Sequence, residues 1–357
     1  MSTAPLRAGL IGYGLAGATF HAPLISTTPG LCLSTVVTAN PDRRRQVAHD
    51  HPDAEVVDTA DALMSRADDL DLLVVATPNR SHVALARAGL QAGIPVVVDK
   101  PLAATAAEGQ ALIDLAAARR VPLTVFQNRR WDSDYRTARR LAADGALGDI
   151  LRLESRYERW RPTPRTGWRE RDDPQEAGGL LYDLGSHLID QALHLLGPVT
   201  EVYAEMDRRR PGARVDDDAF VALHHAGGAR SHLWMSAVAA EPGPRLRLLG
   251  NRAAYTVFGL DGQEDALRAG RLPGGPDWGR EPAERWGRLT TDGTSEAVPS
   301  DPGAYPDFYA GVVAMLRDGA PPPVDPRDSV AGLTVLEAAR RSAAERRVVP
   351  LPDDPAR

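Results

Sequence analysis

The chain has 357 residues, of which 43% are hydrophobic and 25% are charged. This length allows two domains and a large buried core, and the composition is that of an ordinary globular protein. The formal net charge of -6 gives no reason to expect nucleic acid or an anionic membrane as a partner. Cys32 is the single cysteine, and neither a signal-peptide pattern nor a membrane-length apolar run is visible, so we expect a cytoplasmic protein.

The first motif is a glycine-rich turn near the start of the chain. Residues 6–11 predict a short buried strand, which runs into the spacing G-x-G-x-x-G at Gly12, Tyr13, Gly14, Leu15, Ala16 and Gly17. Glycine permits the tight turn, the approach of a pyrophosphate to the backbone, and close packing of the following helix. Such turns are common, but this position between a strand and a helix favours dinucleotide binding.

Further buried strands alternate with helices, and they are predicted over residues 33–38, 71–77, 94–99 and 121–126. This alternation predicts a doubly wound parallel sheet of the Rossmann type over residues 1–126, with a ligand at the carboxyl ends of the strands. The residues at those ends are therefore candidates for the site: Thr77, Pro78, Asn79, Asp99 and Lys100. Lys100 can be a plain surface lysine, but lysine is rare in this arginine-rich chain, and an ammonium group can share a proton with a substrate hydroxyl.

The end of the second strand bears on the choice between NAD and NADP. It lacks the acidic residue that usually binds the ribose 2′-hydroxyl of NAD. Asn40 is predicted to cap the helix that follows, and Arg43 and Arg44 lie at the start of that helix. Arginines there oppose the helix dipole, so a bound phosphate would compensate them, although a solvated basic turn has the same pattern. We expect NADP, with NAD possible, and candidate contacts at Thr38, Asn40, Arg43 and Arg44.

Residues 127–346 predict a second α/β domain, and 347–357 a loose tail. Alternating strands indicate a large, mainly antiparallel open sheet with one face packed on helices, among them a last helix over residues 327–346. The other face carries apolar residues such as Tyr203, Trp234 and Phe258, which suggests a homodimer or homotetramer formed through this sheet.

Residues 178–197 predict a helix that organises this second domain. Asp183, His187, Asp190 and His194 follow one another at steps of four, three and four residues, which would stack them along one side. An imidazole beside a carboxylate in a cleft can exchange a proton near neutral pH. The same pattern also describes the solvated face of an amphipathic helix, whereas a metal site is disfavoured because no Cys or His cluster supplies further ligands. We therefore expect acid/base chemistry and no metal.

Several motifs together resemble the glucose–fructose oxidoreductase/inositol dehydrogenase (Gfo/Idh/MocA) family over nearly the whole chain. They are G-Y-G-L-A-G, F-H-A-P-L, A-T-P-N, D-K-P, N-R-R-W-D and G-G-L-L-Y-D-L-G-S-H. Within that family, G-L-D-G-Q-E-D-A-L-R-A-G-R is similar to the NADP-dependent scyllo-inositol dehydrogenase branch. Asp99 stands where the commoner pattern has glutamate, and the arginine common near the second strand of NADP users is displaced.

The resemblance implies hydride transfer between a nicotinamide and a small polyol or sugar, with Lys100, Asp183 and His187 as the catalytic set. In this scheme His187 is the general base, Asp183 orients it or binds substrate, and Lys100 polarises the reacting oxygen. Candidate substrate contacts are Arg130, Trp131 and Tyr157, together with Trp168 and Arg169. The full set of candidate cofactor contacts comprises Gly12, Tyr13, Gly14, Leu15, Ala16, Gly17, Thr38, Asn40, Arg43, Arg44, Thr77, Pro78, Asn79, His82, Asp99, Lys100, Asn128, Trp168 and Arg169.

Two alternatives remain open at this point. The first is a dehydrogenase of the same family that acts on another sugar or sugar derivative, since specificity depends on loop geometry. The second is a cofactor-binding sensor without turnover, although a sensor has no need of both Lys100 and His187.

Overall fold

The computed structural model describes residues 4–352 and divides into two compact units. The first unit runs up to Asn128 and also contains Gly262–Trp278 and Ala304–Val330. The second contains Arg129–Asp261, Gly279–Gly303 and the chain from Ala331 onward. The sequence predicts contiguous ranges, whereas the chain crosses between the units repeatedly. Within residues 4–352, no helix has the length and apolar character needed to cross a membrane.

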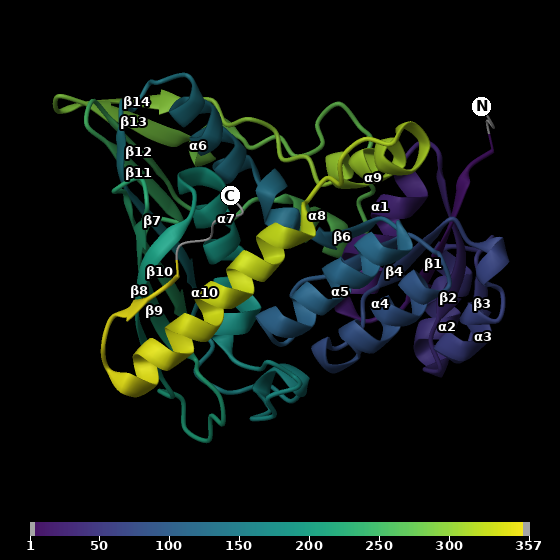
Figure 1. Cartoon of the computed structure of the whole chain (residues 1–357). Helices are drawn as coiled ribbons and strands as arrows, with labels where there is room; N and C mark the ends of the chain where they lie inside the picture. Colours follow the sequence, from purple (N-terminus) through teal and green to yellow (C-terminus); the bar gives the residue numbers. More distant parts are fainter. Residues whose placement is uncertain (1–3, 353–357) are drawn as a thin grey trace. The chain divides into compact units, whose positions relative to one another are not determined.

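The first unit is built on a six-stranded parallel sheet (Figure 1). Its strands are β1 (Leu6–Ile11), β2 (Leu31–Val37), β3 (Glu55–Val57), β4 (Leu72–Val75), β5 (Val96–Asp99) and β6 (Leu123–Phe126). The strand order is β3-β2-β1-β4-β5-β6. The order reverses between β1 and β4, and such a switch point opens a crevice for ligands at the carboxyl ends of the strands. The predicted Rossmann fold is confirmed.

Seven α-helices of the described chain belong to the first unit. They are α1 (Ala22–Thr27), α2 (Pro41–Asp50), α3 (Ala60–Met64), α4 (His82–Gln91), α5 (Ala106–Arg119), α8 (Gln263–Arg268) and α9 (Pro306–Asp318). Helices α4 and α5 lie side by side (Figure 1). Asn40 caps α2 as the sequence predicts, since its side chain accepts hydrogen bonds from the amides of Asp42 and Arg43, both at 3.0 Å.

The second unit contains a nine-stranded sheet. Its strands are β7 (Ile150–Glu158), β8 (Val199–Asp207), β9 (Asp218–His225), β10 (Arg230–Ser236), β11 (Leu246–Gly250), β12 (Ala254–Val257), β13 (Gly287–Thr291), β14 (Thr294–Val298) and β15 (Val349–Pro350). The order is β14-β13-β12-β11-β7-β10-β9-β8-β15. Only β7 and β10 pair in parallel among these described strands, so the expected mainly antiparallel sheet is confirmed.

Helices cover one face of this sheet. Figure 1 shows α6 (Ser133–Ala143), α7 (Ser186–Leu196) and the later part of α10 (Pro326–Glu345) on the same side of the strands. Strand β9 alternates accordingly, with Ala219, Val221 and Leu223 buried beneath the helices. The rings of Phe220 and Trp234 lie 5.1 Å apart on the alternate positions. Self-association through that face stays a prediction.

Two segments differ from the sequence-based expectation. The predicted helix over 178–197 starts as a π-helical turn, Leu181–Gly185, and continues as α7. The tail from residue 347 was expected to be loose, but it contains β15, which pairs with β8. Val349 lies opposite Val202 in this pair and is fully buried, which holds the segment in place. Residues 353–357 lie outside the described chain.

Candidate active site

The glycine loop has the geometry that a dinucleotide-binding turn requires. Gly12 has φ +101°, and a Cβ atom there would lie 2.5 Å from the carbonyl oxygen of Ala76. A Cβ atom on Gly17 would lie 2.0 Å from the carbonyl oxygen of Gly12, so only glycine lets the helix pack against its strand. At Gly14 the nearest atom to such a Cβ is the Arg43 Nη2 atom, 4.0 Å away. Protein contacts alone therefore do not explain why Gly14, the second glycine of the motif, is glycine. The close approach of a cofactor pyrophosphate to the backbone would explain it.

The other loop residues differ in their exposure. Tyr13 is buried, which raises the pKa of its hydroxyl to about 12, and its ring lies edge-on to His51 with 6.2 Å between centroids. Leu15 is 47% exposed, so it is the loop side chain that a bound cofactor can cover. Tyr13 therefore supports the loop from inside, and its predicted cofactor contact can involve only the backbone.

The three arginines at the start of α2, after β2, have different partners. Arg44 forms an ion pair with Asp58, and Arg45 forms one with Asp42. The Arg43 side chain is exposed and reaches toward Gly14, as the 4.0 Å approach shows. Of these three arginines, Arg43 is therefore the one whose guanidinium lies beside the glycine loop.

His82 ties the ends of β4 and β5 together. Its Nδ1 atom lies 2.8 Å from the carbonyl oxygen of Pro101, and its Nε2 atom lies 2.9 Å from that of Thr77. The ring is fully buried, and carbonyl oxygens only accept hydrogen bonds, so both bonds form together only when both ring nitrogens carry hydrogen. His82 therefore supports the backbone at the ends of β4 and β5, and its contact with a cofactor stays a prediction.

Asp99 ends β5 and Lys100 follows it, and the Lys100–Pro101 peptide bond is cis. Burial tends to raise the pKa of Asp99, but the His21 imidazole and the neighbouring cations outweigh burial and lower it. Asp99 is therefore a carboxylate at neutral pH and lies directly before the predicted catalytic lysine.

In the second unit, the turn before α7 presents Asp183. The Arg169 Nε atom donates a hydrogen bond to Asp183 Oδ1 at 3.0 Å, and the Arg169 guanidinium lies 4.3 Å above the ring of Trp168. Glycine is needed at 178 because a Cβ atom there would lie 2.5 Å from the carbonyl oxygen of Arg171. The paired glycines thus let the loop containing Trp168 and Arg169 lie against the start of the helix.

The four polar residues predicted along one helix side have separate environments. His187 is 6% exposed, and its ring faces the Tyr157 ring edge-on at 6.3 Å. The Asp190 carboxylate accepts two hydrogen bonds from Arg130, at 2.7 and 2.8 Å, in a buried ion pair. The exposed His194 has its Nδ1 atom 2.8 Å from the hydroxyl of Tyr135. Asp190 and His194 thus have partners in Arg130 and Tyr135, and the catalytic roles of Asp183 and His187 stay predictions.

The remaining candidates are mostly buried. Asn128 is 5% exposed and Trp131 is half-buried, both in the short helix Asn128–Trp131. Arg130 already binds Asp190 through its Nε and Nη2 atoms. Burial raises the pKa of Tyr157, whose hydroxyl donates to Asp132 Oδ2 at 3.4 Å and is therefore a neutral donor. Substrate contacts by these residues stay predictions.

Sequence reasoning missed a buried arginine in the second unit. Arg245 is 3% exposed, lies 3.1 Å from Asp134 Oδ2, donates to Gln191 Oε1 at 3.0 Å, and stacks 4.3 Å from the Tyr157 ring centre. It fixes the tyrosine against which His187 packs. The sequence showed Arg245 only as the start of a strand, because its partners are far away along the chain.

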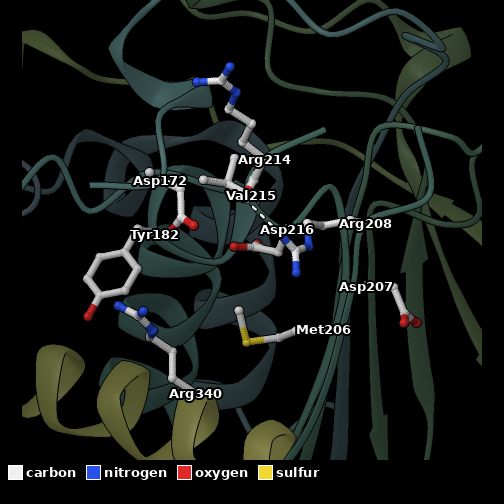
Figure 2. A pocket seen from close by; sticks show the side chains of 10 residues that line it. Asp172, Tyr182, Met206, Asp207, Arg208, Arg214, Val215, Asp216 and Arg340 are labelled. Atoms are coloured by element: carbon white, nitrogen blue, oxygen red, sulfur yellow. Dashed lines mark hydrogen bonds between the residues drawn. The ribbon is translucent and has the colours of Figure 1, made fainter. Parts of the chain in front are cut away.

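The second unit also contains a pocket of ≈ 250 Å³ beside the π-helical turn that precedes α7 (Figure 2). It is lined by Asp172, Gly178, Tyr182, Met206, Asp207, Arg208, Arg214, Val215, Asp216 and Arg340. Burial raises the pKa of Asp216 to about 6, although hydrogen bonding and Arg340 act against this. Both charge signs line the pocket, so it does not select a ligand of one charge.

The fold and the glycine loop indicate a dinucleotide-binding protein, and comparisons with known proteins identify the family. Residues 6–127 match the model of an oxidoreductase family with an NAD-binding Rossmann fold, and residues 135–256 match the Gfo/Idh/MocA C-terminal domain. The chain belongs to the Gfo/Idh/MocA family and is an NAD(P)-binding oxidoreductase.

Similarity to individual relatives extends over nearly the whole chain. The scyllo-inositol 2-dehydrogenase (NADP(+)) IolW of Bacillus subtilis (strain 168) is 37% identical over 97% of this chain and 96% of its own length. The uncharacterized oxidoreductase YdgJ of Escherichia coli (strain K12) is 38% identical over 96% of this chain and 97% of its own. The solved structure of yvaA from Bacillus subtilis has a TM-score of 0.93 and 36% identity, covering 99% of this chain and all of that one.

Proposed function

We propose that this protein transfers hydride between a nicotinamide and a cyclic polyol or related sugar, with an inositol as the preferred class of substrate. The full-length likeness to a scyllo-inositol 2-dehydrogenase carries this proposal. The structure supports it through the glycine loop, in which the space beside Gly14 is open to a ligand. The bound nicotinamide would supply the hydride acceptor or donor.

The proposed roles follow from the chemistry of three side chains. During oxidation the substrate carbon gives up hydride, and His187 takes the proton of its hydroxyl as general base. An imidazole suits this role because histidine is the side chain whose ordinary pKa lies nearest to neutral pH. Lys100 holds the reacting oxygen and favours its developing negative charge. Asp183, oriented by Arg169, binds the substrate or directs the imidazole.

We also propose that NADP is the preferred cofactor. Arg44 and Arg45 are held by carboxylates, whereas the Arg43 guanidinium reaches toward the glycine loop and would bind the 2′-phosphate. Because charge-assisted hydrogen bonds to phosphate are strong, one such residue is enough to favour NADP.

A screen of inositols and aldoses with NAD and NADP, followed at 340 nm, a nicotinamide absorption wavelength, tests the function. On the substrate found, His187→Ala should lower kcat roughly 10²- to 10⁴-fold, which is what general-base catalysis contributes. Its affinity for NADPH should stay near that of wild type.

His194→Ala is the matched control, since His194 is exposed on the same helix and contacts Tyr135. It should keep nearly full turnover. Normal turnover by His187→Ala would remove the assigned base. No turnover across the panel, together with tight cofactor binding, would instead favour a sensor, and turnover restricted to aldoses would favour another sugar as substrate.

A further inference from the structure

Three side chains from distant parts of the first unit meet beside Lys100. His21 ends the π-helical turn Gly17–His21, Asp99 ends β5, and Tyr309 belongs to α9. The Tyr309 hydroxyl lies 2.7 Å from His21 Nδ1, and His21 Nε2 lies 3.7 Å from Asp99 Oδ1. His21 and Tyr309 are both fully buried. None of these contacts follows from the glycine motif.

The chemistry of the partners fixes the direction of the hydrogen bonds. Burial raises the pKa of Tyr309 well above its usual value, so the hydroxyl keeps its proton and donates a hydrogen bond to His21 Nδ1. Because Nδ1 accepts this bond, the imidazole carries its hydrogen on Nε2, which faces Asp99. At 3.7 Å this contact is longer than a hydrogen bond, so the imidazole acts on the carboxylate through its N–H dipole.

Aromatic packing holds the imidazole in this orientation. The ring centroids of His21 and Phe126 are 4.5 Å apart, and Phe126 in turn meets Phe308 of α9 at 4.9 Å. Rotation of the imidazole away from Asp99 would therefore disturb a packed cluster, and buried packing of this kind is costly to disturb.

The consequence concerns the charge at the end of β5. Burial by itself would favour a protonated Asp99, and three groups oppose it: His21 from the π-helical turn, Lys100 beside it, and His82 from α4. The balance lowers the pKa of Asp99, with the His21 contribution the largest of the three.

We propose that His21, oriented by Tyr309, is a positioning residue that keeps Asp99 ionised and thereby holds the Lys100 ammonium charged and in place for the substrate oxygen. The proposal rests on the catalytic role proposed for Lys100. It gives a function to the F-H-A-P-L motif and to a tyrosine contributed by the later part of the chain.

The decisive experiment is a pH profile in the direction of carbonyl reduction. There His187 donates a proton, so its own protonation does not limit the rate at low pH. In His21→Leu, Asp99 loses its largest stabilising contact and takes up a proton at higher pH, so the acid limb of kcat should move up by about one pH unit. Tyr309→Phe should produce a smaller shift in the same direction. NADPH affinity at pH 8 should be unchanged in both.

Tyr305→Phe is the matched control, because Tyr305 is buried in the same segment but packs on Phe20 rather than on His21. It should leave the pH profile as in wild type. If kcat in His21→Leu and Tyr309→Phe falls by one factor at every pH, both residues are merely structural and the proposal is overturned.

A second readout needs no substrate and separates this proposal from the proposed function. The unfolding free energies of wild type, His21→Leu, Asp99→Asn and the double variant at pH 7 form a double-mutant cycle. A favourable coupling between His21 and Asp99 is expected even if no polyol turns over, in which case only the proposed function fails. Strictly additive effects would overturn the assignment of His21.

Discussion

The arginines after β2 show how neighbouring residues of one type acquire different roles. Arg44 and Arg45 have carboxylate partners, Asp58 and Asp42, and ion pairs of exposed residues like these contribute little to stability. Arg43 differs because its guanidinium reaches toward the glycine loop at Gly14. Identical side chains on one helix turn are thus divided between surface pairing and a candidate phosphate contact.

Replacing Arg43 should change cofactor preference without harming the fold. Arg43→Ala is expected to raise KM for NADP roughly 10- to 100-fold, because hydrogen bonds to charged groups contribute about 1.5–3 kcal/mol, and to leave KM for NAD nearly unchanged. Steady-state kinetics with both cofactors measures this. Arg45→Ala is the control and should change neither value. If the double variant Arg43→Ala, Arg44→Ala kept the wild-type ratio of NADP to NAD turnover, the NADP proposal would be wrong.

Single residues were predictable where a local motif fixes them. Asn40 was predicted as a helix cap and is one, because capping depends on residues two and three positions away. Cys32 lies in β2, and burial raises the pKa of its thiol, which keeps it unreactive. Arg245 and Tyr309 were not predictable, because their partners Asp134 and His21 are more than 100 residues away in the chain.

At the scale of elements, the start of the organising helix is held by an acidic residue outside it. Asp216 Oδ2 accepts a hydrogen bond from the amide of Leu181 at 2.7 Å, and its backbone oxygen accepts one from Leu180 at 3.0 Å. A Cβ atom on Gly179 would lie 2.0 Å from Asp216 Oδ1, so glycine leaves room for the carboxylate. Figure 2 shows this carboxylate among the pocket residues.

The pH dependence of stability should report on this carboxylate. Its folded pKa of about 6 exceeds the ordinary value of 3.8, so the folded state binds the proton more tightly than the unfolded chain. The proton on Asp216 therefore contributes its full stabilisation of the folded state below about pH 4, and this contribution is lost as the pH rises through 6. Asp216→Asn keeps an oxygen acceptor without the charge, and at pH 8 it should unfold with a free energy up to about 3 kcal/mol higher than wild type.

Urea unfolding at pH 4 and pH 8 measures this difference. The gain in unfolding free energy caused by Asp216→Asn should shrink toward zero at pH 4, where Asp216 is protonated in the wild type as well. Asp207→Asn is the control, since Asp207 is an exposed residue of the same pocket and pairs with Arg209. An equal effect of Asp216→Asn at both pH values would contradict the raised pKa of Asp216.

The sequence predicted most elements of both sheets but not the irregular start of this helix. Hydrophobic periodicity identifies a helix by its spacing, and a π-helical turn such as Leu181–Gly185 changes that spacing by one residue over a single turn. Asp183 lies in this turn and is therefore offset from His187, Asp190 and His194, which keep regular helical spacing in α7. Short strands such as β3, β13 and β15 were also missed, because two to five residues carry little periodic signal.

At the scale of the whole molecule, the nucleotide-binding unit is assembled from three separate segments of the chain. The Thr124 hydroxyl on β6 donates to the carbonyl oxygen of Val324 at 2.8 Å, in a buried contact. Phe308 and Tyr309 of α9 complete the aromatic cluster around Phe126. Sequence patterns predicted the sheet of this unit but not its later segments, because nothing local in residues 262–278 or 304–330 indicates the unit to which they belong.

A fragment ending at residue 128 should therefore fail to fold cooperatively. Without Val324, Phe308 and Tyr309 it would expose Phe126 and leave Thr124 and His21 without their partners. We expect a broad, weakly cooperative urea transition and little NADPH binding, in contrast to the full-length chain measured alongside. A sharp transition at a urea concentration near that of the intact protein would show that residues 262–278 and 304–330 are dispensable.

The interleaving of the two units has a consequence for biosynthesis. The amino-terminal strands leave the ribosome first, yet the core that they belong to also needs residues up to Val330 of a 357-residue chain. Domains made of one continuous segment can fold as soon as they emerge. Here translation must pass residue 330 before the glycine loop is fully supported, so nicotinamide nucleotide would be captured only after the segments 262–278 and 304–330 have also been made.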